Sequence, residues 1–344
     1  MQRAMTTTDD PNPTAGPLPS AQDVWAALER DPTQGDLQRR FRDYPDHDVY
    51  FIRLANGTRL VHFVIGGPIG KEWRRARASR GVGVRVRIQT AEKADLWLEE
   101  KTHNRPEQFT LLSADLMELL DAQQDRPPGL GILDRLCARI RSWQDFFARD
   151  SSALTLEARL GLFGELTTLV EHLQPRLGVE AYDGWTGAER AVHDFEFETL
   201  AVEVKAFKAA QPAVVRIHSE RQLDALGAGR LYLAVNEFDV RADGEGKTLE
   251  ELIQRVRGQV AGDPSRLDTL NDRLIAAGYL DEQGGSYEER YKLRRCDVFK
   301  VIDSFPRITP AHLPIGVGRV SYDLSIASCS PWAIEWDAVF EEGG

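Results

Sequence analysis

The stretch from residue 193 to residue 205 limits the folds open to this chain more than any other, because it contains two runs of alternating apolar and charged side chains. The runs read His-Asp-Phe-Glu-Phe and Ala-Val-Glu-Val-Lys, with Glu198-Thr199 and a leucine between them. Two such runs joined by a short polar turn predict an antiparallel β-hairpin. Because strand side chains alternate, Glu203 and Lys205 share one face, and Asp194 on the partner strand comes within reach of Glu203.

Two carboxylates and one ammonium at the edge of a pocket favour a metal-assisted phosphate reaction. Mg²⁺ takes oxygen ligands, so Asp194, Glu203 and the backbone carbonyl of Val204 are candidate ligands, with Mn²⁺ as a substitute metal. Lys205 is placed to orient and help deprotonate an attacking water and to stabilise charge on the phosphorus centre. The hairpin therefore predicts a site for Mg²⁺-dependent phosphodiester hydrolysis.

The spacing of these residues resembles the PD-(D/E)xK signature of restriction-endonuclease-like nucleases, matched here by Asp194, Glu203 and Lys205. The proline of that signature is replaced by His193, at a position that varies in the superfamily. The simpler alternative is a Glu-Lys pair on the exposed face of an edge strand, since glutamate also stands two residues before Lys101 and Lys247. Those two lie in a charged run and a glycine-rich turn, whereas valines frame only the pair at 203 and 205.

A helix is predicted upstream, at residues 156–173, by apolar residues at helical spacing. Thr155 is a suitable N-cap, and Pro175 with Gly178 marks the end. Glu165 lies among apolar residues of this helix. It is either a surface charge beside a close packing contact or a third carboxylate directed at the metal; restriction-like nucleases often carry a glutamate on the helix before the catalytic hairpin.

Downstream, residues 213–218 predict a third strand, residues 219–226 a helix and residues 230–238 a fourth strand. The order helix, three strands, helix, strand is that of the restriction-endonuclease-like α/β core. Gln222 has two readings. With Ser219 it forms a capping box, which satisfies the backbone alone; some relatives of the fold place a glutamine here near the metal or phosphate, which would make Gln222 a support for the metal ligands.

The resemblance extends over most of the chain, from about residue 49 to residue 324, and is to a bacterial family of PD-(D/E)xK-motif proteins. Members of that family tend to be encoded beside methyltransferase and ATPase genes of restriction or phage-defence clusters, which implies partners of those two kinds. The segments that carry the resemblance are Gly161 to Glu165, Trp185 to Gly187, Asp194-Phe195, Val202 to Lys205, Ser219 to Leu223 and Phe305 to Pro310.

The length of 344 residues and the 42% apolar content allow two domains. We expect a disordered tail at 1–20, a β-rich N-terminal domain at 21–112, a helical connector at 113–154, the nuclease core at 155–240 and an α/β C-terminal part packed on the core at 241–344. The three cysteines are scattered, which argues against zinc sites and disulfides. With no signal peptide and no apolar run long enough to cross a bilayer, we expect a soluble cytoplasmic protein.

A basic segment stands out in a chain whose net charge is −11. Between residues 71 and 87 seven basic residues face one acid, and four of them are the predicted DNA contacts, Arg74, Arg75, Arg77 and Arg80. Only a local positive field can offset the repulsion between an acidic protein and DNA phosphates. A solvated loop paired with acids elsewhere is the alternative.

The sequence thus predicts a Mg²⁺-dependent DNA endonuclease of a bacterial restriction or phage-defence system, with Asp194 and Glu203 binding metal, Lys205 serving the water and Glu165 assisting. The rival is a non-catalytic DNA-binding or scaffold subunit of a defence complex that retains the fold. The acidic net charge favours a protein that needs partners to reach DNA, and a homodimer stays open.

Overall fold

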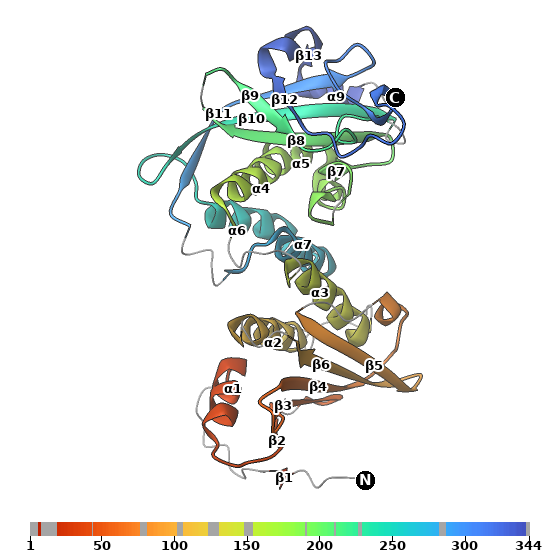
Figure 1. The fold of residues 1–344 in the computed structure, drawn as a ribbon, viewed down its shortest axis with the longest axis vertical. Coiled ribbons are helices and arrows are strands. Elements are labelled where there is room, and N and C mark those ends of the chain that lie inside the picture. Colours follow the sequence, from red (N-terminus) through yellow and green to blue (C-terminus); the bar gives the residue numbers. More distant parts are fainter. Residues whose placement is uncertain are drawn as a thin grey trace. The chain divides into compact units, whose positions relative to one another are not determined.

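The computed structural model describes residues 6–7, 19–42, 44–75, 81–101, 106–122, 131–147, 154–189, 191–209, 211–225, 229–281 and 287–341. The chain divides into two compact units, residues 1–150 and residues 151–344 (Figure 1). Both contain helices and sheets, so the fold is mixed α/β. No helix in the described ranges is long and apolar enough to cross a membrane.

The first unit is built on a six-stranded sheet with the order β1-β2-β3-β4-β6-β5. Its strands are β1 (Thr6–Thr7), β2 (Leu37–Arg40), β3 (His47–Arg53), β4 (Arg59–Gly66), β5 (Val82–Thr90) and β6 (Lys93–Glu100). Its helices are α1 (Ala21–Arg30), the 3-10 turn η1 (Glu72–Arg75), α2 (Pro106–Asp121) and α3 (Ile132–Phe147). Of the tail expected at 1–20, residues 1–5 and 8–18 lie outside the described ranges, whereas β1 pairs with β2 in parallel.

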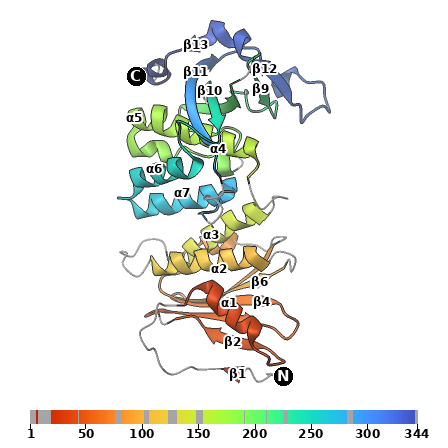
Figure 2. The ribbon, with the colours of Figure 1, turned by 90° about the vertical axis from the view of Figure 1, so that its left-hand side faces the viewer.

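Local signals account for the elements of this unit. The β3–β4 hairpin turns at Asn56-Gly57, where Gly57 has a φ of +83° that L side chains rarely adopt. One face of the sheet is packed against helices: Trp25 of α1 contacts Phe51 of β3 and Phe109 of α2, at ring distances of 4.8 and 5.8 Å. Figure 2 shows α1 lying across the strands.

The second unit holds a five-stranded sheet with the order β13-β11-β10-β8-β7 and a separate two-stranded sheet of β9 and β12. Strands β8 and β10 are parallel, and the other neighbours in the larger sheet are antiparallel. The strands are β7 (Phe195–Glu196), β8 (Leu200–Lys208), β9 (Val214–Ile217), β10 (Arg230–Arg241), β11 (Arg290–Val301), β12 (Tyr322–Ser325) and β13 (Ala333–Ile334).

One face of this larger sheet forms a core with the helices of the unit, and β9 and β12 pack on the other face. The helices are α4 (Leu156–Thr168), a π-helical turn η2 (Leu169–Leu173), α5 (Gln174–Leu177), α6 (Leu249–Val260), α7 (Pro264–Ala277) and α9 (Trp336–Glu341), with 3-10 turns η3 (Gly178–Tyr182), η4 (Gly187–Glu189), η5 (Pro310–His312) and η6 (Ile326–Trp332). Thr155 caps α4 by accepting a hydrogen bond from the Ala158 N–H at 3.2 Å, as expected. Gly178, with φ of +64°, ends the helical stretch.

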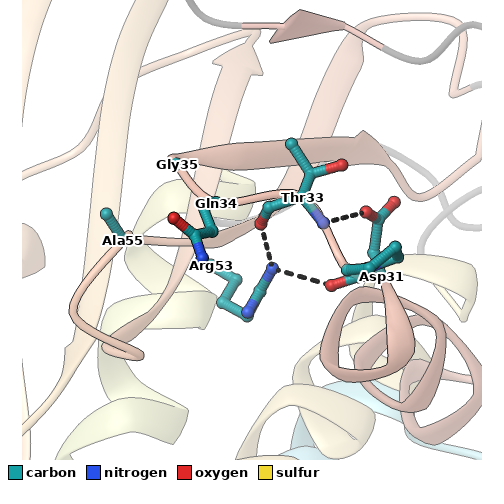
Figure 3. A pocket seen from close by; sticks show the side chains of 7 residues that line it. Asp31, Thr33, Gln34, Gly35, Arg53 and Ala55 are labelled. Atoms are coloured by element: carbon teal, nitrogen blue, oxygen red, sulfur yellow. Dashed lines mark hydrogen bonds between the residues drawn. The ribbon is translucent and has the colours of Figure 1, made fainter.

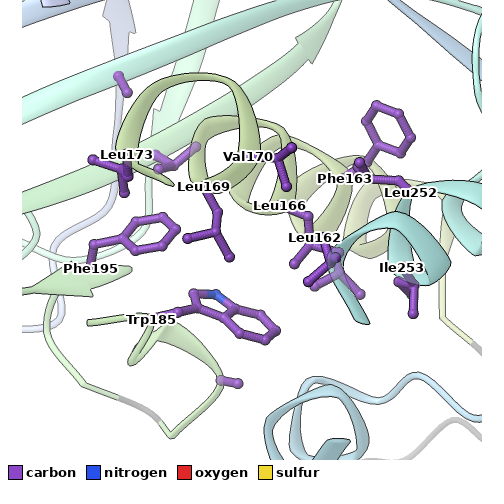
Figure 4. Close-up of a cluster of buried hydrophobic side chains, with 14 of the residues drawn as sticks. Leu162, Phe163, Leu166, Leu169, Val170, Leu173, Trp185, Phe195, Leu252 and Ile253 are labelled. Atoms are coloured by element: carbon purple, nitrogen blue, oxygen red, sulfur yellow. The ribbon is translucent and has the colours of Figure 1, made fainter. Parts of the chain in front are cut away.

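Helix α4 lies close against β8, because Gly164 faces the side chain of Ala206 without a Cβ of its own. The leucines of α4 and η2 pack on Trp185 and Phe195, and on Leu252 and Ile253 of α6 (Figure 4). Asn236 is fully buried on β10, and its Nδ2 donates a hydrogen bond to the Thr168 hydroxyl at 2.9 Å. This bond links the sheet to helix α4. This packing fixes α4 relative to the β7–β8 hairpin.

The third strand forms as β9 and pairs with β12 in a separate two-stranded sheet. One expectation about the core order was wrong. The helix expected at 219–226 is absent from its described part, residues 219–225, which form a turn. The cause is a tertiary contact: the buried carboxylate of Glu220 accepts hydrogen bonds from the N–H groups of Arg319 and Val320.

Candidate active site

The predicted hairpin is present, with β7 and β8 antiparallel and Phe195 opposite Val202. The Phe197 N–H donates to the Leu200 carbonyl at 2.8 Å, which closes the turn. Val202 and Val204 point into the core under α4. The intervening residues of β8 therefore point to the other face of the sheet.

Glu203 and Lys205 occupy that face and are both withdrawn from solvent. Their side chains are 1% and 12% exposed, and Lys205 Nζ donates to Glu203 Oε1 at 2.5 Å. Glu203 Oε2 is buried and forms no hydrogen bond in the structure. An exposed edge-strand pair would leave both groups in water, so the simpler reading of this Glu-Lys pair is wrong. A buried acceptor without a donor is costly and suits an oxygen that binds a cation.

Hydrogen bonds to both its side chain and its backbone carbonyl hold Asp194 beside this pair. The Val204 N–H donates to its Oδ2 at 2.8 Å, and the N–H groups of Thr186 and Gly187 donate to its backbone carbonyl at 2.9 and 3.0 Å. A Cβ at Gly187 would lie 2.8 Å from Asp194 Oδ1, so the close approach needs glycine. The segment Trp185 to Gly187 thus positions the aspartate.

Glu165 approaches the same place from α4. Trp185 Nε1 donates to its Oε2 at 2.8 Å. That oxygen and Asp194 Oδ1 lie 3.2 and 2.8 Å from the same point, the Cβ position that Gly187 lacks. The structure therefore brings Glu165 beside Asp194, and the indole donor of Trp185 fixes its direction. The sequence alone did not reveal this role of Trp185, because it depends on a contact across 20 residues.

Electrostatics in the cluster follow from burial and like charge. Burial, and then the neighbouring Asp194 carboxylate, raise the pKa of Glu203 well above its usual value. Burial also raises the pKa of Asp194, against the opposing effects of Lys205 and the Val204 N–H. Burial alone would lower the pKa of Lys205, but Glu203 and Asp194 raise it, so the amine is an ammonium here. It can stabilise negative charge, and in this state it cannot accept a proton from water.

The donor set fits a hard divalent cation. Asp194 and Glu203 supply carboxylate oxygens, one of which is the buried oxygen without a donor. In a β-strand the N–H and C=O of one residue point to the same side, so the Val204 carbonyl points toward Asp194, as its N–H does. No three His, Cys, Asp or Glu side chains within the described ranges are arranged closely enough to hold a metal. The fitting set is therefore two carboxylates and one carbonyl, with Glu165 beside it.

Gln222 stabilises the turn after β9 by a hydrogen bond to the backbone. Its Oε1 accepts the His218 N–H at 2.8 Å, while Ser219 Oγ accepts the Arg221 N–H at 3.2 Å. The glutamine therefore satisfies the backbone, although not through the expected capping box. It also fixes His218, whose pKa is lowered by partial burial and then by the charge of Lys205. His218 is a neighbour of the site that sequence spacing did not indicate.

The four arginines expected to bind DNA belong to the first unit. Arg74 is exposed and lies over the Trp73 ring at 5.6 Å. Only the backbone of Arg75 is described, and Arg77 and Arg80 lie outside the described residues. This unit also has a pocket of about 470 Å³ between residues 31–35 and Arg53 (Figure 3). Its arginine donates to the backbone carbonyls of Asp31 and Thr33, which ties the loop to β3.

Comparisons with known proteins agree with the motif. The signature of the family DUF4420, described as "Putative PD-(D/E)XK family member", matches residues 21–327. Neither the curated proteins nor the solved structures contain a match. With a match over most of its length and the Asp194, Glu203 and Lys205 motif on a hairpin, the chain belongs to the DUF4420 family, within the nuclease-like PD-(D/E)XK superfamily.

Proposed function

We propose that this protein is a Mg²⁺-dependent DNA endonuclease that hydrolyses phosphodiester bonds. One observation carries the proposal: a fully buried glutamate pairs with a lysine on its own strand, while an aspartate is held against the same strand by a backbone N–H. Structural packing gives no reason to bury two carboxylates and one ammonium together. Metal-dependent hydrolysis of a phosphodiester can use such groups, the carboxylates to hold the cation and the ammonium to stabilise charge in the transition state.

Each residue has a definite task in this reaction. Asp194, Glu203 and the Val204 carbonyl would hold Mg²⁺, or Mn²⁺ in its place. The bound ion supplies Lewis acidity at the phosphate and lowers the pKa of a bound water. Lys205 would direct its ammonium at the negative charge that develops on the phosphoryl oxygens when a water, whose proton passes to solvent, attacks phosphorus and the P–O bond to the leaving oxygen breaks. Glu165, fixed by Trp185, assists beside Asp194. Gln222 supports the site by holding the turn that carries His218.

The cellular setting is also part of the proposal. The family resemblance supports a bacterial restriction or phage-defence role in the cytoplasm, with a methyltransferase and an ATPase as partners. The net charge of −11 supports a nuclease that reaches DNA with the help of such partners and of the basic segment at 71–87. A homodimer is compatible with all of this.

Plasmid nicking tests the activity. Purified protein should convert supercoiled plasmid to open-circular or linear DNA with Mg²⁺ or Mn²⁺, and EDTA should stop it. Lys205→Ala should lower the rate by about 10²–10³, the usual cost of one preorganised charge interaction. Lys208→Ala is the matched control, because Lys208 is an exposed lysine on the same strand. An equal rate for Lys205→Ala and Lys208→Ala would refute the catalytic role.

Two features favour a second candidate, a non-catalytic DNA-binding or scaffold subunit of a defence complex. Lys205 already neutralises Glu203, and within the described ranges no three acidic side chains form a metal group. A degenerate nuclease fold could retain such a pair. The two functions differ in cells: phage protection that survives both Lys205→Ala and Asp194→Ala would support the scaffold.

A further inference from the structure

A row of five side chains runs across the sheet of the first unit. Strand pairing places Arg40 beside Tyr50, Tyr50 beside His62, His62 beside Trp97 and Trp97 beside Arg85. The row therefore crosses β2, β3, β4, β6 and β5 in order. It lies on the face opposite Phe51, because side chains alternate along each strand.

The rings of this row stack on one another. Tyr50 and His62 lie 5.9 Å apart at 29°, and His62 and Trp97 lie 4.7 Å apart at 8°. The guanidinium of Arg85 covers the other side of the Trp97 ring at 4.7 Å. Trp97 thus stacks on His62, which stacks on Tyr50, and an exposed arginine covers the other side of the Trp97 ring.

A buried acid fixes this arrangement. Asp95 is 2% exposed and accepts hydrogen bonds from His62 Nε2 at 3.0 Å, Arg87 Nε at 2.9 Å and Gln89 Nε2 at 2.6 Å. The first of these holds the imidazole against Trp97, and Arg87 itself lies 5.3 Å from the Trp97 ring. A buried carboxylate is tolerated when it is fully bonded, so the face is a rigid, preorganised one.

The arginines of this face differ in whether a carboxylate pairs with them. Arg40 pairs with Asp48, and Arg87 pairs with Asp95. Arg85 forms no ion pair with a described carboxylate, and its guanidinium is exposed. Excess positive charge above an aromatic ring, in a chain of net charge −11, is complementary to a phosphate-linked base.

We propose that the face made by Tyr50, His62, Trp97, Arg85 and Arg87 binds an unpaired base of a nucleic-acid strand. The base enters between Trp97 and Arg85, so that the indole stacks on one side of it and the guanidinium on the other. Arg87 and the displaced end of Arg85 then meet the adjoining phosphates. The inference rests on the proposed function only in taking DNA as the partner, and it adds a second site on a separate unit.

The experiment measures binding without cleavage. Full-length protein carrying Asp194→Asn, in EDTA, is titrated with fluorescein-labelled single-stranded and duplex 20-nucleotide DNA, followed by anisotropy. In this background Trp97→Leu should weaken single-strand binding by roughly 5- to 150-fold, the range for one lost stacking contact, and duplex binding much less. Arg85→Ala should weaken it as well and reduce the slope of log affinity against log salt by about 0.7.

Three controls separate stacking from loss of fold. Trp97→Tyr keeps a ring and should retain most of the affinity. Trp73→Leu removes another tryptophan that lies near an arginine, Arg74, but that stacks on no ring of the described residues, and it should leave the preference for single strands over duplex unchanged. Arg85→Ala is at an exposed position, so it remains informative if Trp97→Leu unfolds the unit.

The proposal is overturned if Arg85→Ala and a folded Trp97→Leu both bind single strands as the parent does, which would leave the face to a protein partner. Equal losses for single-stranded and duplex DNA would also overturn it, because they indicate backbone contacts alone. Neither outcome depends on nicking activity, so failure of the base site is distinguishable from failure of the nuclease.

Discussion

The contact between α4 and β8 gives a sharp prediction for Gly164, which directly precedes Glu165. A Cβ at Gly164 would lie 2.6 Å from the Cβ of Ala206, and both atoms are attached to backbone. Real Cβ atoms do not approach so closely, so the helix would have to move away from the strand. Overpacking of this kind typically costs about 1–3 kcal/mol. Gly164→Ala should destabilise the second unit by that amount and displace Glu165 from Asp194.

Gly161 lies one turn earlier on the same helix and is the matched control. A Cβ at Gly161 would have no neighbour within 4 Å, so Gly161→Ala gains helix propensity of about 0.5–1 kcal/mol. For a unit of this size, 1 kcal/mol corresponds to about 2–4 °C in Tm. Thermal unfolding should therefore show a lower Tm for Gly164→Ala, by about 2–12 °C, and a slightly higher one for Gly161→Ala. Equal Tm values for the two variants would refute the packing argument.

Three further predictions concern charge and hydrogen bonding. Native Glu203, with its raised pKa, keeps its proton to higher pH than the unfolded chain does, so its burial costs stability as pH rises above about 4. In metal-free buffer Glu203→Gln should thus be neutral near pH 4 and stabilising near pH 7 in denaturant unfolding. Trp185→Phe should cost about 1.5–3 kcal/mol by removing a donor to a carboxylate, and less in a Glu165→Ala background. The third prediction concerns the four arginines of the basic segment, Arg74, Arg75, Arg77 and Arg80. Reversing their charge should reduce the slope of log DNA affinity against log salt by about one unit per lost phosphate contact. An unchanged slope would place the DNA surface elsewhere.

Elements with a local signal could be predicted from sequence. The N-cap at Thr155, the Asn56-Gly57 turn and the alternation around Glu203 each act within a few residues, and the corresponding helix and hairpins formed. The turn after β9 could not be predicted. Ser219 and Gln222 indicate a helix start, but Glu220 is bound by backbone groups 99 and 100 residues away. A tertiary contact overrode a local preference.

The residues of the candidate site could likewise be predicted from sequence only in part. Asp194, Glu203 and Lys205 lie within one hairpin, so their spacing was enough to bring them together. Trp185, Gly187 and His218 could not be assigned, because their roles depend on how α4, the loop before β7 and the end of β9 meet in space. No pattern within those segments specifies these contacts.

Calorimetric titration with Mn²⁺ tests most directly whether the buried carboxylates form a metal site. The wild-type chain should bind Mn²⁺ with measurable heat, and Asp194→Asn and Glu203→Gln should each weaken binding by on the order of tenfold or more, because each removes a charged ligand. Glu196→Gln is the matched control, since this acid is exposed on the same hairpin, and it should bind as the wild type does. Equal affinity in all four proteins, or no binding by the wild type, would contradict the metal-dependent site.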